Sequence, residues 1–131
     1  MTPLAIPAWS ADGLENLLIA DTGLAIIYAI FAVAARFGRP RRNPVAGVRT
    51  PATLSSDEAW RAGHRAAQPW FAAGAVVAAV AAGIGWYCLS VGAIDAGLVI
   101  AWVGLLVLVS LTIRMVIAAN RAAAAEPRSS R

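Results

Sequence analysis

Three long apolar runs constrain this chain more than any other feature. They cover residues 17–35, 70–91 and 97–119, and the second contains no charged side chain. A helix of about 20 apolar residues crosses the roughly 30 Å of hydrocarbon in a bilayer. A soluble domain with 60% hydrophobic and 14% charged residues would expose too much apolar surface. The sequence therefore predicts an all-α integral membrane protein, with residues 1–131 forming a single membrane domain of three transmembrane helices.

The positions of the arginines predict the orientation of these spans. All 11 basic residues are Arg, and they lie either in the segment 36–69 or from position 114 onward. Arg-rich loops remain in the cytoplasm, and Arg in place of Lys is typical of a bacterial genome rich in GC. We therefore expect a multi-pass protein of the bacterial inner membrane with its N-terminus outside. Residues 1–16 form an external segment, 36–69 a cytoplasmic loop and 120–131 a cytoplasmic tail.

Several classes of function are disfavoured by composition. The chain has one cysteine, Cys88, and one histidine, His64, too few for a disulfide framework or a zinc or iron–sulfur site. We expect no cofactor, no metal and no nucleic-acid partner. The external segments are too short to form a pocket, so the candidates for function are the loop 36–69, the intramembrane surfaces and the short tail after Asn120.

The loop divides into three parts. Residues 38–44 combine proline with arginine and are expected to follow the inner membrane surface, held by anionic lipid head groups. Gly47 and Pro51 then predict a turn. Ser55 and Glu58 form a capping-box pattern, which predicts a helix over 56–68 that lies in the membrane interface with Trp60 toward lipid. One face of this helix carries Trp60, Gly63, His64 and Ala67.

The loop also carries an extended motif, N-x3-G-x-R-T-P-x-T-L-x5-W-x3-H-R. Its residues are Asn43, Gly47, Arg49, Thr50, Pro51, Thr53, Leu54, Trp60, His64 and Arg65. This motif, followed by two spans with a short connection, resembles the signature loop of the SdpI family of small bacterial membrane proteins. The resemblance implies a non-enzymatic accessory, immunity or signalling factor. Its best-known relative protects against a secreted toxic peptide and draws a small repressor to the membrane, but that relative has more spans, which leaves immunity open here.

The motif supplies the candidate binding residues for a protein or peptide partner. An arginine fork binds a phosphate or a carboxylate through two hydrogen bonds, so a basic pocket is one interpretation. The alternative is a folded loop whose side chains satisfy each other and cap helix ends. The candidates are Arg49, Thr50, Pro51, Thr53, Trp60, His64 and Arg65.

Asp21 supports an alternative function, a small oligomeric transporter or proton-coupled carrier. Ionisable groups within a span are functional candidates, although a depth of about 6 Å could let this carboxylate reach water or Thr22. A third hypothesis is an enzyme that acts on lipid head groups through Arg49, His64 and Arg65, for which the loop offers one general base.

The second span also predicts close helix contacts. Small residues repeated every four positions let helices approach, either within the chain or between copies of it in a homo-oligomer. The two rows are Gly74, Ala78 and Ala82, and Ala75, Ala79 and Gly83.

Overall fold

The structure is a computed structural model that describes residues 8–37, 42 and 46–126. This part of the chain forms three helices, α1 (Ala8–Arg36), α2 (Asp57–Ser90) and α3 (Ile94–Ala124), with no strand among the described residues. Each helix is long and apolar enough to cross a membrane, which confirms the predicted all-α fold with three spans. The predicted surface-following segment 38–44 and the end of the tail lie largely outside the described residues.

The helices are longer than the apolar runs that predicted them. α1 begins at Ala8, so part of the expected external segment 1–16 is helical. α2 unites the predicted helix 56–68 with the predicted span 70–91 and continues through Pro69. Because proline lacks the N–H that would bond to the preceding turn, α2 loses one internal hydrogen bond there without ending. At 1.5 Å per residue α2 is about 51 Å long, well beyond the hydrocarbon thickness of about 30 Å.

The start of α2 differs from the capping-box prediction by one residue. Ser56 is the N-cap, and its side chain accepts a hydrogen bond of 3.0 Å from the Ala59 N–H. The Ser55 hydroxyl instead donates to the Ala52 carbonyl. The expectation that Trp60 faces lipid is wrong, because this side chain is 1% exposed and packs inside the protein.

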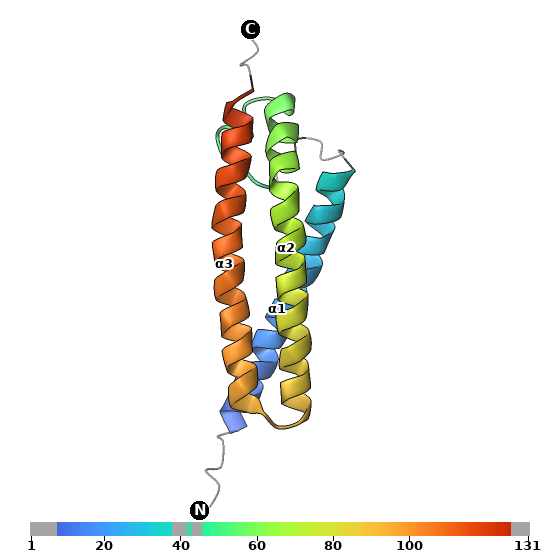
Figure 1. The fold of residues 1–131 in the computed structure, drawn as a ribbon, viewed down its shortest axis with the longest axis vertical. Coiled ribbons are helices and arrows are strands. Elements are labelled where there is room, and N and C mark those ends of the chain that lie inside the picture. The colour runs from blue at the N-terminus through green and yellow to red at the C-terminus, as the bar shows by residue number, and fades with distance from the viewer. Residues whose placement is uncertain (1–7, 38–41, 43–45, 127–131) are drawn as a thin grey trace, which may run out of the picture.

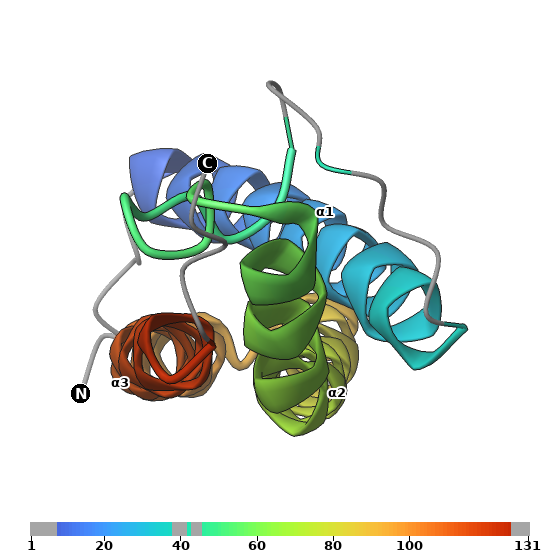
Figure 2. The same ribbon diagram turned by 90° about the horizontal axis from the view of Figure 1, so that it is seen from above.

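α2 is the central helix of the molecule. It packs against both α1 and α3, whereas α1 and α3 contact each other much less. Figure 1 shows α2 and α3 running side by side in opposite directions, while α1 crosses behind them at a tilt; Figure 2 shows this oblique crossing from above. The connection from α2 to α3 is a tight turn in which Gly92 has φ of +74°, a conformation that glycine adopts without steric cost.

Small residues allow the helices to come close together. A Cβ atom at Gly74 would overlap the ring of Tyr28 on α1, and one at Gly104 on α3 would meet Ala81 on α2. The row Gly74, Ala78 and Ala82 is buried within the chain. In the second row Ala79 and Gly83 are exposed, and a Cβ at Gly83 would meet nothing within 4 Å.

The core is divided between the two ends of the helices. One cluster, near the turn between α2 and α3, contains Leu14, Leu18, Ile94 and Ala101. The other lies near the opposite end and contains Val48, Ala67, Phe71, Met115 and Ala119. Because Val48 belongs to the connection between α1 and α2, part of this connection is a component of the core rather than a free linker.

Candidate functional site

The loop 46–56 folds through a closed set of threonine hydrogen bonds. The Thr53 hydroxyl accepts from the Thr50 N–H at 2.8 Å, and the Thr50 hydroxyl accepts from the Thr53 N–H at 3.1 Å. The Thr53 hydroxyl in turn donates to the Val48 carbonyl at 2.8 Å. Thr53 is fully buried. These bonds satisfy the backbone of a turn that belongs to neither helix.

His64 on α2 fixes the other side of the loop. Its Nε2 atom accepts a hydrogen bond of 3.2 Å from the Val48 N–H, and its Nδ1 atom lies 2.9 Å from the Trp60 carbonyl. This pattern assigns the neutral tautomer with the proton on Nδ1, because Nε2 must act as an acceptor. The Trp60 ring lies beside the imidazole, with 4.0 Å between the ring centroids.

Gly47 makes this close approach possible. Its φ is +112°, in the region that favours glycine. A Cβ atom at this position would collide with His64 Nε2 and would lie 3.0 Å from the Trp60 ring. Gly63 has a similar role on α2, since a Cβ there would lie 2.8 Å from Thr53 and 3.1 Å from the Ala119 carbonyl of α3. The glycines of the loop region therefore let loop, α2 and α3 pack together.

The seven candidate binding residues separate into two groups. Thr53, Trp60 and His64 are buried, and their contacts stabilise the loop. Both ring nitrogens of His64 are engaged, so it is not free to bind a phosphate. The group at the surface consists of the exposed Arg49, Pro51 and Arg65 together with the half-buried Thr50.

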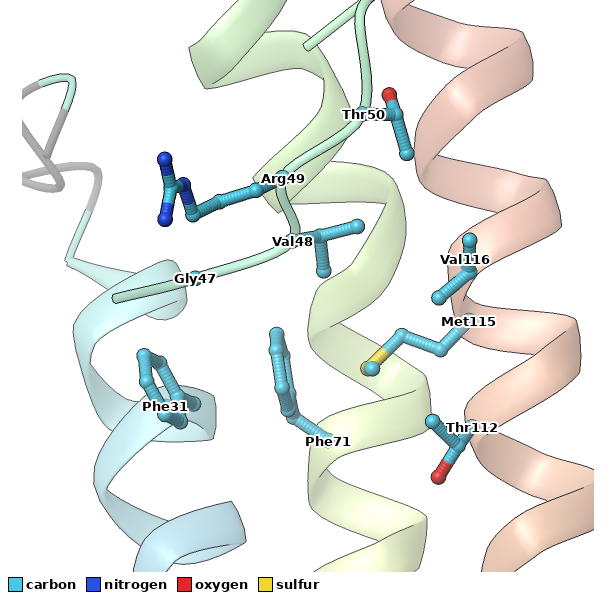
Figure 3. A pocket seen from close by; sticks show the side chains of 9 residues that line it. All are labelled: Phe31, Gly47, Val48, Arg49, Thr50, Phe71, Thr112, Met115 and Val116. Carbon is cyan, nitrogen blue, oxygen red and sulfur yellow. The ribbon is translucent and has the colours of Figure 1, made fainter. Parts of the chain in front are cut away.

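A cavity of about 290 Å³ lies beneath the loop. Figure 3 shows Arg49 extending from the loop above Phe31 of α1, while Phe71 of α2 and Met115 of α3 line the interior. Phe71 stacks on Phe31 with 5.2 Å between ring centroids. The lining residues are Phe31, Gly47, Val48, Arg49, Thr50, Phe71, Thr112, Met115 and Val116. The site thus combines an apolar interior with one cation at its edge.

The sequence predicted Arg49 and Thr50 on the loop side of this cavity but none of the residues on its helix side. Phe31, Phe71, Met115 and Val116 read as ordinary residues of apolar runs. Hydrophobic patterning does not distinguish a side chain that lines a cavity from one that faces lipid. Phe71 lies near Met115 and Val116 because α2 and α3 run side by side (Figure 1), and α1 adds Phe31, which stacks on Phe71.

Asp21 is separate from the loop site. It is 1% exposed, and neither carboxylate oxygen has a hydrogen-bond partner. The expectation that it reaches water or Thr22 is wrong, because the Thr22 hydroxyl donates to the Leu18 carbonyl and accepts from the Trp86 Nε1–H. Asp21 points into the protein because it shares the inward face of α1 with Leu14 and Leu18.

The comparison with protein families agrees with the motif in the loop. The model of the SdpI/YfhL protein family matches residues 39–118, more than half of the chain. The chain belongs to the SdpI/YfhL family. No curated protein matches it, and no solved structure does. The matched range contains the loop, all of α2 and most of α3.

Proposed function

We propose that this SdpI/YfhL family protein is a non-enzymatic accessory, immunity or signalling factor that binds a protein or peptide partner. The observation that carries the proposal is Arg49, an exposed cation at the edge of an apolar cavity. On the arginine distribution we place this end of the molecule in the cytoplasm, with the exposed apolar side chains of the spans in contact with membrane lipids.

The construction of the loop supports binding by its surface. A simple connector between two spans needs no buried hydroxyl network, whereas this loop is held by the Thr53 hydroxyl and by Nε2 of His64. The other ring nitrogen of His64 bonds to the Trp60 carbonyl within α2 and orients the imidazole. Ordering these residues costs conformational entropy. The ordered frame gives Arg49 and Pro51 a fixed position, which reduces the entropy lost when a partner binds.

The lining of the cavity favours an apolar side chain of a peptide. Its volume is about 290 Å³, at the lower end of the range of roughly 300 to 1,000 Å³ for ligand pockets. Its walls of Phe31, Phe71 and Met115 suit an apolar side chain, and methionine adapts readily to different shapes. Arg49 would pair with an acidic group next to that side chain.

An enzyme acting on lipid head groups is the weaker alternative. Its general base would be His64, but this imidazole is 3% exposed and bonded at both nitrogens. A proton-coupled carrier has one observation in its favour, the buried and unpartnered carboxylate of Asp21. That residue is treated separately below because it does not depend on the loop.

Photo-crosslinking in intact cells tests the proposed function. A photoreactive amino acid at position 51 should give a discrete protein adduct, and Arg49→Glu in the same chain should reduce its yield at least severalfold. The matched control places the photoreactive group at position 61, whose native Arg61 is also exposed but pairs with Glu58 at 3.1 Å. Adducts of equal yield from positions 51 and 61, or adducts unaffected by Arg49→Glu, would contradict binding at this surface.

A further inference from the structure

Asp21 occupies a level of the helix bundle between two close helix contacts. On α1, Leu18 packs at the position of Gly85 on α2, and Tyr28 packs at that of Gly74. Asp21 lies between them on the same inward face and is 1% exposed. Its two oxygens are buried without a hydrogen-bond partner.

No charged group of the neighbouring helices is placed to neutralise this carboxylate. Residues 70–86 of α2 and 96–113 of α3 contain no Asp, Glu, Arg, Lys or His. Asp95 and Arg114, which flank the α3 stretch, are both exposed, and the Tyr28 hydroxyl is paired with Thr112. The remaining nearby titratable groups are Glu15 on α1, which is exposed, and Tyr87 and Cys88 at the end of α2.

Three kinds of ligand could neutralise the Asp21 carboxylate: a metal ion, a basic side chain of a second protein and a proton. A buried carboxylate without a counter-ion is strongly disfavoured, so such a group is neutralised. Calcium needs six to eight oxygen ligands and magnesium a near-octahedral set, and the described residues contain no cluster that could hold a metal ion. A basic side chain of a second protein could not reach a residue that is 1% exposed. A proton remains as the ligand that fits.

Two polar side chains beside Asp21 bond to each other rather than to its carboxyl group. Trp86 is 39% exposed, and its Nε1–H donates to the hydroxyl of Thr22, the residue next to Asp21, at 3.2 Å. The Thr22 hydroxyl donates to the Leu18 carbonyl and the indole N–H only donates, so neither group relays a proton to Asp21. Because Asp21 is 1% exposed, water reaches its carboxyl group only when the helices separate locally.

We propose that Asp21 is a proton-binding site inside the membrane domain, which holds its side chain as the neutral acid and exchanges the proton with water through local opening of the helices. The packing favours this role over a structural one. Leu14 and Leu18 occupy the same face, and an apolar residue at position 21 would leave no polar atom unsatisfied. A polar group that breaks an apolar pattern without a compensating bond is typical of a functional site. The proposal goes beyond partner binding and does not depend on it.

Infrared spectroscopy of the full chain in lipid bilayers tests this site. A protonated carboxylic acid has a carbonyl stretching band that a carboxylate lacks. At about pH 8 a carboxyl group in contact with water is ionised and lacks this band. We expect the band in the wild-type chain and in the matched control Glu15→Gln, its loss in Asp21→Asn, and its shift to lower frequency in D2O within minutes.

Three outcomes would overturn the proposal. They are the absence of the band in the wild-type chain, its persistence in Asp21→Asn, and a band that does not shift in D2O, which would indicate a sealed acid rather than an exchanging site. If Asp21→Asn does not fold, wild-type protein labelled with ¹³C at the aspartate carboxyl carbon replaces it. The band must then shift with the label, and an unshifted band would assign the proton to a glutamate.

Discussion

His64 shows how a residue of the loop motif can be a structural component of the protein. It accepts from the Val48 N–H and donates to the Trp60 carbonyl. Thr53 and Trp60 are buried beside the same turn. The sequence predicted all three as binding residues because a motif does not reveal whether its polar atoms face a partner or each other. Only burial separates these roles, and burial depends on the tertiary packing of the loop.

His64→Ala should release the loop from α2. The change leaves the buried Val48 N–H without an acceptor, which costs about 1 to 3 kcal/mol, and it removes the imidazole packed on Trp60. Hydrogen–deuterium exchange should show faster exchange at the backbone of residues 46–54. Arg65→Ala is the matched control, since this exposed neighbour should leave exchange unchanged. Equal protection in His64→Ala and the wild-type chain would refute the assigned role.

Gly47→Ala should destabilise the same loop for a different reason. An alanine at φ of +112° is strained by about 1 to 2 kcal/mol, and its Cβ would collide with His64. The midpoint of thermal unfolding in detergent micelles should fall. Gly83→Ala is the control, because nothing lies within 4 Å of the added atom and alanine favours helix. A Gly47→Ala midpoint at or above that of the wild-type chain would argue against this geometry.

The helices could be predicted from the sequence in number and kind but not in their limits. Apolar runs of span length determine the three helices, because a bilayer requires backbone hydrogen bonds to be satisfied within each segment. The same runs do not reveal that α2 continues through Pro69, since a proline in a polar stretch more often marks a boundary. Packing of the first turns of α2 against the loop and α3, through Trp60 and Gly63, provides contacts that the pattern does not contain.

Close packing of α1 on α2 makes a prediction about two glycines of the same helix. Gly74→Val should force the Tyr28 ring away and lower the free energy of unfolding by about 1 to 3 kcal/mol, as is typical of overpacking. Gly83→Val adds the same atoms on the exposed face and should have a much smaller effect. Unfolding by a denaturing detergent measures both variants. If Gly74→Val and Gly83→Val lowered the stability equally, the Gly83 face would instead lie in a contact with another chain.

The two proposed sites, the loop surface and Asp21, lie in different parts of the molecule. The loop lies at the end of the helices that includes the start of α2 (Figure 1), and the cavity is lined by loop residues. Asp21 lies in α1 beside Thr22, which bonds to Trp86 near the end of α2. The two proposals therefore fail independently. Arg49→Glu should leave the infrared band of Asp21 unchanged, and Asp21→Asn should leave crosslinking from position 51 unchanged.

The cytoplasmic position of the loop is the claim on which partner binding depends. Cys88 is buried, so its thiol would react poorly with a maleimide. The measurement therefore uses a chain in which Cys88→Ser removes this thiol. Ser90→Cys then places a thiol beside the turn between α2 and α3, and Ser55→Cys places one in the loop; both serines are exposed. A membrane-impermeant maleimide added to intact cells should label Ser90→Cys and not Ser55→Cys, with both labelled after permeabilisation. Labelling of Ser55→Cys in intact cells, with Ser90→Cys protected, would contradict the account.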